Sequence, residues 1–505
     1  MPGPAQPIRK SLHWIGLAGG AVLAALLASL PTHGLSVDEA HYALYAYFPD
    51  WSYFDHPPLV GWIQLPGLWL GGGDFAMRLA PLACWILALV LLHRLTLRLF
   101  ADPEGSRAAD GGVLVGLTTP MFLILAMSIR PDVLLLPVTC AAMLAVWRLR
   151  DPAEALRTGP WLALGAILGI AGLSKYTAVF LALSSAAVLV QRHGRAILSR
   201  RGPWLALALA VAMASPVFLW NAKHHWVSFR YQGLHAAGGS SWQLGELFRV
   251  QWEELKVYGP LTALAVGLGL WKCRRSAVAG FCLAFAAPPA LTIALLSGRG
   301  GSINYWTAFA WIAAFPLAGM GLAQGWRSRR TKRWLVGVGV VQALFCLLIF
   351  ARIWDGGPAE DSPIRRNPVA DLYGWDQAAA RARELATSRG LNSVAVVNWT
   401  LASRIAWYAR PFVVYVLDER FDQIDIWFGK LPVGQSTILI QWSRLPYEIP
   451  VRPSTPQGFA RCQRLEEMPI RRGDKIISRF EFFLCEDWGG AVVSAPQNTE
   501  HISAY

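Results

Sequence analysis

The chain has 505 residues, of which 54% are hydrophobic and 15% are charged, and it carries 24 tryptophans and a formal net charge of +14. Soluble globular proteins contain about a quarter charged residues, so this composition excludes an ordinary soluble domain and indicates a polytopic membrane protein. Because basic residues of membrane proteins collect in cytoplasmic loops, the positive charge does not by itself indicate binding to nucleic acid.

Apolar stretches long enough for membrane-spanning helices recur up to residue 351. A span needs about 17 to 25 apolar residues, and fewer where neighbouring helices cover its ends. The first stretch follows Arg9 and Lys10, as in a signal peptide; that alternative stays open, but the length of the stretch favours a span. The eighth is the weakest, with 15 uncharged residues between Lys256 and Lys272. The eleven predicted spans are residues 12–31, 77–93, 111–129, 132–147, 159–174, 176–191, 203–221, 257–271, 277–297, 304–323 and 334–351.

Residues 222–256 are predicted to form an outer loop that contains an amphipathic helix. In "SWQLGELFRVQWEELKVYG", apolar residues repeat at helical spacing opposite Glu246, Arg249 and Glu253. This pattern is typical of a helix that lies on a membrane surface. The apolar positions are Leu244, Leu247, Phe248, Trp252 and Leu255.

The character of the chain changes after residue 352. Residues 352–505 hold 18 of the 46 basic residues, and "SVAVVNW", "PFVVYVL" and "STILIQW" read as strands, with a helix at "TLASRIAWYA". We therefore expect a small α/β domain after a transmembrane catalytic domain at residues 1–352. Cys462 and Cys485 share this tail and could form a disulfide in an oxidising compartment. The other five cysteines lie in predicted spans or at their ends.

The distribution of basic residues predicts the orientation of the chain. Alternate loops collect 20 Lys and Arg, against eight in the opposite loops before residue 352. The richer side is predicted to be cytoplasmic, which places the N-terminus inside and, with eleven spans, the tail outside. Membrane topology thus explains most of the positive charge, and nucleic-acid binding is not expected.

Ionisable residues gather at the outer ends of the predicted spans. The first outer loop, residues 32–76, is rich in acids and histidines and contains no Lys or Arg. Ionisable groups at the bilayer boundary are costly to bury, so function is the default hypothesis for them. The outer loops together bring Asp38, Glu39, His41, Asp55, His56, Arg130, Asp132, Lys175, His224, His225, Arg230, Arg299 and Asn304.

Each of these residues also has a structural interpretation. Ser36 and Glu39 fit an S-x-x-E capping box, and Asp38 in the first turn suits the helix dipole, so these acids could simply start a helix. Arg130 and Lys175 fit basic span ends that extend toward water. Histidines at an interface are more often interfacial residues than ligands. The convergence of five outer loops on one side favours a functional site.

The motifs "DEAHYALYA", "YFDHPPLVGW", "RPD", "LSKYTAVF" and "NAKHHWVSFRYQ" resemble the bacterial branch of the protein O-mannosyltransferase and aminoarabinose transferase group. Tail segments such as "DLYGWDQAA" and "RFDQIDIW" extend the resemblance over nearly the whole chain. These enzymes are polyprenyl-phosphate-sugar-dependent transferases of the GT-C superfold. The resemblance implies a polytopic α-helical membrane protein of that superfold with a small C-terminal periplasmic α/β domain, in the bacterial inner membrane.

The resemblance also implies roles for single residues. Asp38 matches the essential acid of the first outer loop, Asp132 matches an acid of the second, and Lys175 matches a basic residue that holds the donor phosphate. In the aminoarabinose transferases an Arg stands in place of His41, and Glu-Lys-Pro-Pro stands where this chain has "DHPP" from Asp55. Two fixed cations are thus replaced by titratable imidazoles, so the resemblance does not identify the sugar.

The chemistry of the residues leads to the same class of enzyme. The sequence has no Walker A loop, Rossmann glycine fingerprint or D-x-D motif, so a lipid-linked sugar is the expected donor. A leaving phosphate needs cations, and the attacking oxygen needs a carboxylate. A divalent metal near Asp55 and His56 is left open. We predict Asp38 and Asp132 as catalytic residues; His41, Asp55, His56, Arg130, Lys175, His224, His225 and Arg299 as donor-binding residues; and Glu39, Tyr42, Arg230 and Asn304 as supporting residues.

The predicted function is transfer of one sugar from a polyprenyl phosphate to lipid A or lipopolysaccharide core at the periplasmic face, with inversion and by a monomeric enzyme. A protein or another lipid is the alternative acceptor. A transporter could also use charges within the membrane, although no inverted repeat is found. A lipid-binding scaffold is a further alternative, in which the acids would be replaceable.

Overall fold

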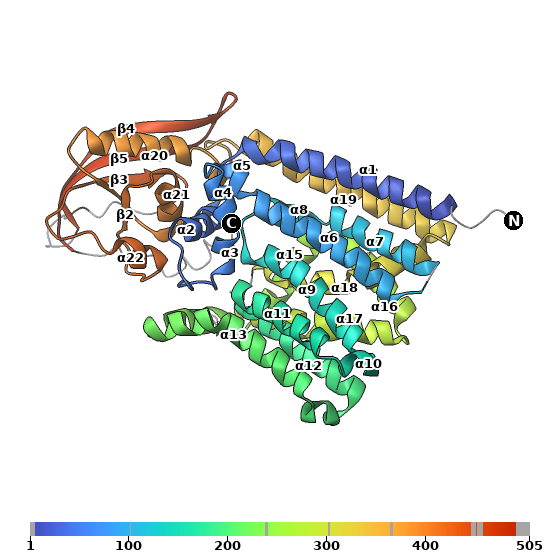
Figure 1. Cartoon of the computed structure of the whole chain (residues 1–505). Helices are drawn as coiled ribbons and strands as arrows, with labels where there is room; N and C mark the ends of the chain where they lie inside the picture. Colours follow the sequence, from blue (N-terminus) through green and yellow to red (C-terminus); the bar gives the residue numbers. More distant parts are fainter. Residues whose placement is uncertain are drawn as a thin grey trace. The chain divides into compact units, whose positions relative to one another are not determined.

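The computed structural model describes residues 6–101, 103–237, 241–300, 303–363, 367–445, 451 and 458–490 (Figure 1). Contacts divide the chain into two compact units. The first is built from the described parts of Met1–Ala28, Asp50–Gly67 and Ala76–Leu347, and the second from those of Ser29–Pro49, Leu68–Phe75 and Leu348–Tyr505. Two parts of the first outer loop thus fold with the tail. The predicted domain boundary at residues 352 and 353 stays a prediction.

The first unit is helical. Some of its helices begin at a start signal in the sequence: α9, for example, has Arg130 in an extended conformation at its N-cap and a proline in its first turn. The helices that lie wholly or partly in this unit are α1 (Gln6–Ser29), α3 (Leu59–Trp62), α4 (Leu65–Trp69), α5 (Asp74–Met77), α6 (Leu79–Leu99), α7 (Glu104–Thr118), α8 (Pro120–Met127), α9 (Pro131–Leu149), α10 (Pro152–Ala155), α11 (Thr158–Ser174), η2 (Tyr176–Ala178), α12 (Val179–His193), η3 (Arg195–Ser199), α13 (Arg201–Lys223), α14 (Val227–Ala237), α15 (Leu244–Tyr258), α16 (Pro260–Cys273), α17 (Ala277–Ser297), η4 (Asn304–Thr307), α18 (Ala308–Gly325) and α19 (Arg329–Asp355).

Several of these helices can cross a membrane. In the described ranges, six are long and apolar enough to span a bilayer, or up to eight if each of two bent pairs counts as one span. The predicted multi-pass membrane protein is therefore confirmed. Three of the eleven predicted spans lie on helices of 14 to 17 residues, which are α11, α12 and α16. Crossing of the bilayer by these three stays a prediction.

The predicted span at residues 111–129 is wrong as a single helix. α7 ends at Thr118, α8 begins at Pro120, and the two helices are bent by 67°. Thr119 has an extended backbone, with φ −74° and ψ 117°. Pro120 lacks a backbone N–H and disfavours a helical conformation of the residue before it, so the helix breaks there.

The side chain of Gln342 on α19 joins two helix ends at this break. It is fully buried at 0% exposure. Its Nε2 donates to the carbonyl oxygen of Thr118 at 2.9 Å, and its Oε1 accepts from the N–H of Leu261 at 3.0 Å. Thr118 ends α7 and Leu261 lies in the first turn of α16, where backbone groups have no partner within their own helix. Gln342 therefore satisfies one backbone group on each of two neighbouring helices.

Gln342→Leu is expected to lower the free energy of unfolding by roughly 1–3 kcal/mol, because it leaves the buried N–H of Leu261 unpaired and the carbonyl of Thr118 with only the weak donor Cys346 Sγ. Thermal or denaturant unfolding of the purified protein in mild detergent measures this loss. Val340→Ala, at a half-exposed position on the same helix, is the matched control and should change stability much less. Equal stability of the Gln342→Leu and Val340→Ala variants would contradict the assigned role.

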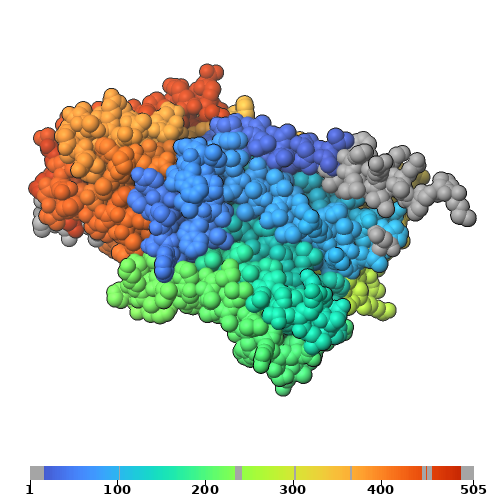
Figure 2. Space-filling view, viewed as in Figure 1, coloured from blue at the N-terminus to red at the C-terminus, as the bar shows by residue number. Residues whose placement is uncertain are grey.

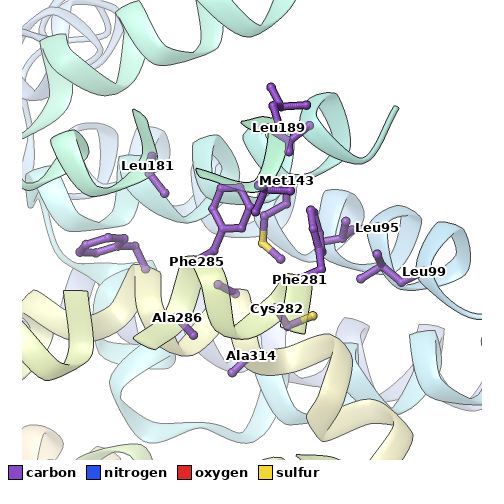
Figure 3. Packing of buried hydrophobic residues seen from close by; sticks show 14 of the residues in the cluster. Leu95, Leu99, Met143, Leu181, Leu189, Phe281, Cys282, Phe285, Ala286 and Ala314 are labelled. Carbon is purple, nitrogen blue, oxygen red and sulfur yellow. The ribbon is translucent and has the colours of Figure 1, made fainter. Parts of the chain in front are cut away.

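The core of the first unit lies among α6, α9, α12, α17 and α18. Figure 3 shows Leu95 and Leu99 on α6 and Met143 on α9 near Phe281 and Phe285 on α17. α18 also comes close to the backbone of α7, where a Cβ at Gly319 would clash with the carbonyl of Ala108. Such crossings through small residues are typical of helices packed in membranes.

The second unit is built around a five-stranded mixed sheet with the order β2-β1-β3-β5-β4. β1 pairs in parallel with β2 and β3, and β5 pairs antiparallel with β3 and β4. The three predicted strands and the helix between the first two are confirmed, whereas the long β4–β5 hairpin was not predicted. The elements of this unit are η1 (Leu30–Thr32), α2 (Val37–Tyr47), η5 (Ala370–Leu372), α20 (Trp375–Thr387), β1 (Ser393–Val396), α21 (Trp399–Tyr408), β2 (Val413–Val416), α22 (Gln423–Phe428), β3 (Thr437–Trp442), β4 (Phe459–Arg472) and β5 (Lys475–Trp488).

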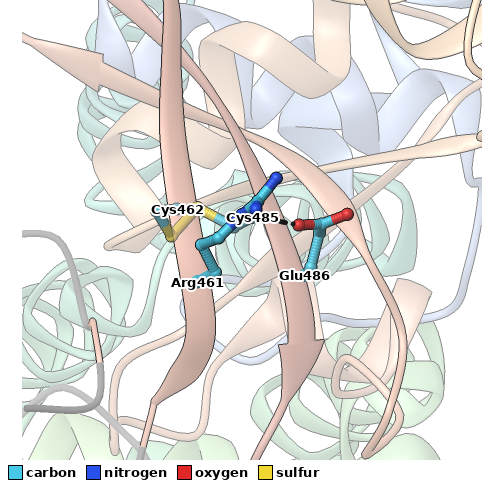
Figure 4. Close-up of a disulfide and its surroundings, with 4 residues drawn as sticks. All are labelled: Arg461, Cys462, Cys485 and Glu486. Atoms are coloured by element: carbon cyan, nitrogen blue, oxygen red, sulfur yellow. Dashed lines mark ion pairs between the residues drawn. A yellow bond between two sulfur atoms is a disulfide. The ribbon is translucent and has the colours of Figure 1, made fainter.

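A disulfide joins the two long strands. Cys462 on β4 lies directly opposite Cys485 on β5, and the two sulfurs are bonded (Figure 4). Arg461, the residue before Cys462, and Glu486, the residue after Cys485, form an ion pair at 3.1 Å. The predicted disulfide is therefore confirmed.

Asp418, in the loop after β2, carries a buried carboxyl group with 3% exposure. Burial, reinforced by the charge of Asp422, raises the pKa of Asp418 from its ordinary value of 3.8 to about 7. Between these two pH values the folded protein holds a proton that the unfolded chain releases. The contribution of Asp418 to stability is therefore largest below the unfolded pKa and is lost as the pH rises through the folded pKa.

Asp418→Asn is expected to stabilise the protein more at pH 8 than at pH 5, because asparagine stays neutral and removes the cost of a buried charge. The measurement is the thermal unfolding of both proteins at the two pH values. Asp474→Asn, at an exposed position in the β4–β5 turn, is the control for removal of an acid from this unit. A stability difference that is the same at both pH values would show that Asp418 does not titrate in this way.

Candidate functional site

The two acids at the start of α2 have different structural roles. Glu39 is buried at 3% exposure, and its Oε2 accepts hydrogen bonds from the backbone N–H and the hydroxyl of Ser36 at 3.0 and 2.9 Å. The predicted capping box is therefore confirmed. Asp38 takes no part in the box and is partly exposed. Its carboxylate is thus not required to start the helix.

A buried arginine lies within electrostatic range of Asp38 in the second unit. The guanidinium of Arg404 is 1% exposed, pairs with Asp371 and lies 3.6 Å from the ring centroid of Trp375. Burial lowers the pKa of Arg404, and the charge of Asp38 is among the influences that raise it. Arg404 was not predicted as a site residue, because a single arginine inside a predicted helix does not reveal its burial beside Asp371 and Trp375.

His41 packs α2 against the rest of the second unit. Its side chain is 2% exposed, and its Nδ1 lies 3.0 Å from the hydroxyl of Ser403 on α21. Aromatic rings surround it, with centroids 5.3 Å away at Tyr45 and 5.6 Å away at Trp399. Tyr42 is also buried, with its ring edge-on to His41. These contacts give His41 a packing role, and its part in donor binding stays a prediction.

In the first unit, Asp132 and Lys175 form a buried ion pair. Lys175 Nζ lies 2.6 Å from Asp132 Oδ1, and the two residues are 4% and 2% exposed. Asp132 is in the first turn of α9, and Lys175 follows α11 in an extended conformation. Lys175 therefore does not extend to the surface. Asp132 Oδ2 is buried and makes no hydrogen bond within the described ranges, so it can still accept one.

Two aromatic rings lie beside these charges. The guanidinium of Arg130 is 4.3 Å from the ring centroid of Tyr305, and Lys175 Nζ is 5.7 Å from the same centroid and 5.5 Å from that of Trp306. Both rings come from η4, before α18. A cation over an aromatic face is attracted by the ring quadrupole, and more strongly where water is excluded. Two cations, one acid and two rings are thus brought together.

Tyr176, the residue after Lys175, joins this cluster to the first outer loop. Its hydroxyl lies 2.6 Å from that of Ser228 on α14. The carboxylate of Asp55 is close enough to interact electrostatically with the same Tyr176 hydroxyl. The backbone oxygen of Asp55 also accepts from the side chain of Gln232 at 2.5 Å. Asp55 therefore lies within electrostatic range of Tyr176, and its part in donor binding stays a prediction. His56 is half-buried in the same loop.

The other predicted residues occupy the outer loops of the first unit. The ring of His224 stacks on Trp220, with centroids 3.9 Å apart, and Nδ1 of His224 lies 2.9 Å from the carbonyl of Trp220. His225 is exposed and has a left-handed backbone, with φ 55°. Arg230 on α14 and Arg299 beyond α17 are exposed, and the carbonyl of Asn304 accepts from the hydroxyl of Tyr258 at 3.1 Å. Their predicted roles in binding stay predictions.

An apolar cavity of about 520 Å³ runs along α11, α12 and α13. Lys175, Tyr176 and Phe229 line one end of it, and Trp161, Ile197 and Trp204 line the other. Along α11 these ends are about 20 Å apart at 1.5 Å per residue. Figure 2 shows the outer surface of these helices in teal to green. The lining is mostly apolar, and Lys175 is the one charged residue among the described residues that line it.

No group of three or more His, Cys, Asp and Glu side chains forms a candidate metal site in the part of the chain that the structure describes. The predicted involvement of a metal at Asp55 and His56 therefore stays open.

Comparison with known proteins identifies the chain's relatives. The family model of dolichyl-phosphate-mannose-protein mannosyltransferases matches residues 55–220, a stretch that contains Asp55, Arg130, Asp132 and Lys175. Residues 55–220 are thus similar to this family. The lipid A galacturonosyltransferase RgtD of Rhizobium johnstonii is 28% identical over 198 residues, which are 39% of this chain and 40% of that protein. The match thus spans less than half the length of this relative.

Two solved structures resemble nearly the whole chain. Apo ArnT from Cupriavidus metallidurans has a TM-score of 0.62 at 15% identity, covering 97% of this chain and 100% of that one. The same protein bound to undecaprenyl phosphate has a TM-score of 0.63 at 16% identity, covering 96% and 99%. The predicted polytopic α-helical GT-C fold with a small C-terminal α/β domain is confirmed, and the periplasmic position of that domain stays a prediction.

Proposed function

We propose that the chain is an integral membrane glycosyltransferase that moves one sugar from a polyprenyl-phosphate donor to lipid A or lipopolysaccharide core. The observation that carries this proposal is the position of Lys175 at one end of the apolar cavity. A polyprenyl phosphate has the same two parts, a long hydrocarbon chain and an anionic head. The similarity to the ArnT structure bound to undecaprenyl phosphate supports this donor.

The charges of the site suit departure of a phosphate. In a single displacement with inversion, the acceptor hydroxyl attacks the anomeric carbon while the bond from that carbon to the phosphate oxygen breaks. Negative charge then grows on the lipid phosphate, and Lys175 and Arg130 are the proposed cations that stabilise it. The hydroxyl proton passes to a carboxylate, for which Asp38 is the first candidate and Asp132 the second.

The proposed acceptor rests on the matched relative, a lipid A galacturonosyltransferase. A protein acceptor is the second candidate, because the matching family model is described as a protein mannosyltransferase. Mass spectrometry of lipid A from cells with and without the gene distinguishes them. One extra sugar mass that depends on the gene supports a lipid A acceptor. Unchanged lipid A together with a gene-dependent glycoprotein would support the alternative.

We place the protein in a bacterial inner membrane, with its donor site and second unit on the periplasmic face. The asymmetry of 20 to eight basic residues supports this orientation. The Cys462–Cys485 disulfide also fits an oxidising compartment. Labelling of single introduced cysteines with a membrane-impermeant reagent tests the orientation. Protection of a cysteine introduced at position 474, an exposed site in the β4–β5 turn, in intact cells with a permeable outer membrane would overturn it.

A further inference from the structure

α15 has a buried side that its amphipathic sequence does not reveal. The predicted surface helix is confirmed as a helix, and its apolar residues Phe248 and Trp252 are 63% and 60% exposed. Val250, Glu254 and Tyr258 are buried on another side of the same helix. Glu254 is only 8% exposed, so it is a buried acid for which the proposed reaction has no use.

The carboxylate of Glu254 binds the start of α18. Its Oε1 accepts from the hydroxyl of Thr307 at 2.5 Å and from the indole N–H of Trp311 at 2.8 Å. One turn further along α15, the ring of Tyr258 stacks on Trp311 with a centroid distance of 4.8 Å. The hydroxyl of Tyr258 donates to the carbonyl of Asn304 at 3.1 Å. α15 therefore holds both ends of η4 (Asn304–Thr307).

The residues held between these contacts are Tyr305 and Trp306, whose rings lie beside Arg130 and Lys175. We infer that Glu254 is a positioning residue, which fixes these two rings so that Arg130 and Lys175 are set for the phosphate of a polyprenyl-phosphate donor. This inference rests on the proposed function. Glu254 itself touches neither cation in the described contacts and acts through η4.

The contacts require an acceptor at this position and do not require a charge. Burial raises the pKa of Glu254, while the hydrogen bonds from Thr307 and Trp311 lower it by less. A glutamine oxygen can accept from the same two donors. An alanine would leave the indole N–H of Trp311 without its acceptor and the hydroxyl of Thr307 with only its longer contacts, 3.2 Å to the Asn304 carbonyl and 3.3 Å to the Tyr258 hydroxyl, and would loosen η4. Glutamine is therefore expected to rescue the function that alanine loses.

The test compares Glu254→Ala, Glu254→Gln and Thr307→Val in proteoliposomes with a polyprenyl-phosphate-sugar donor. Glu254→Ala should raise the KM for the donor roughly 10-fold to 100-fold, as displaced binding groups do, and leave the KM for the acceptor unchanged. Glu254→Gln should stay close to the wild type, and Thr307→Val should shift the donor KM in the same direction by less. Glu253→Ala, on the partly exposed side of α15 where Glu253 pairs with Lys256, is the matched control.

Binding of undecaprenyl phosphate alone, measured by native mass spectrometry, separates this inference from the proposed function. Weaker binding by Glu254→Ala with rescue by Glu254→Gln supports the positioning role. Wild-type binding by Glu254→Ala would overturn it, and so would a loss of binding in Glu254→Gln as large as in Glu254→Ala. Should Glu254→Ala not fold, Thr307→Val decides the question, because unchanged donor binding in that variant also overturns the role. A wild-type protein that transfers no sugar would instead refute the proposed function.

Discussion

Asp38→Asn is expected to fold normally and to lose about 100-fold to 10,000-fold of its sugar-transfer rate, the usual effect of removing a general base. The structural reason is that Ser36 and Glu39 make the capping box of α2 without Asp38. Asparagine is also well tolerated near a helix start, so the loss of stability should be at most about 1 kcal/mol. The measurement is turnover in reconstituted membranes at equal amounts of folded protein.

Glu39→Gln is the matched control for this experiment. Glutamine keeps an oxygen that accepts from Ser36 and preserves a capping box, so activity should change little. An Asp38→Asn variant with near-normal turnover would exclude Asp38 as the base. The second candidate, Asp132, would then take its place.

Lys175→Gln is expected to destabilise the protein by about 3–5 kcal/mol as well as to weaken donor binding, because it leaves the carboxylate of Asp132 buried and unpaired. The two effects can be separated with a second change. The double variant Asp132→Asn, Lys175→Gln removes both buried charges and should regain much of the lost stability. It should not regain affinity for the donor, because neutral glutamine offers no charge to a phosphate.

Unfolding in detergent and binding of undecaprenyl phosphate measure these effects for the two single variants and the double variant. Recovery of stability without recovery of binding assigns Lys175 to the donor site. Donor affinity equal to that of the wild type in Lys175→Gln would leave the ion pair with a structural role only.

Several site residues could be predicted because their position at the outer end of a span is visible in the sequence. Asp132 and Lys175 were both predicted, yet their contact was not, since 43 residues separate them and only the packing of α9 and α11 brings them together. Tyr305 and Trp306 directly follow Asn304, which was predicted, and an aromatic pair at the start of a span was the available signal.

Other features depend on tertiary contacts that periodicity does not reveal. α15 shows an apolar and a charged face in its sequence, but Glu254 is buried on a side defined by Thr307 and Trp311. The break between α7 and α8 was visible as the pair Thr119–Pro120, but the apolar composition of the segment favoured a continuous span. His41 was expected to bind the donor, but two of the rings around it, Trp399 on α21 and Trp427 on α22, come from more than 350 residues away.

The central claim is transfer of a sugar from a polyprenyl phosphate, and reconstitution tests it most directly. Purified protein in liposomes is supplied with lipid A and a panel of undecaprenyl-phosphate-linked sugars, and both lipid products are followed by mass spectrometry. The account predicts that one donor is consumed, with free undecaprenyl phosphate and a glycosylated acceptor formed in equal amounts, and that Asp38→Asn nearly abolishes both. Intact donors throughout the panel, with lipid A and with protein acceptors alike, would contradict it.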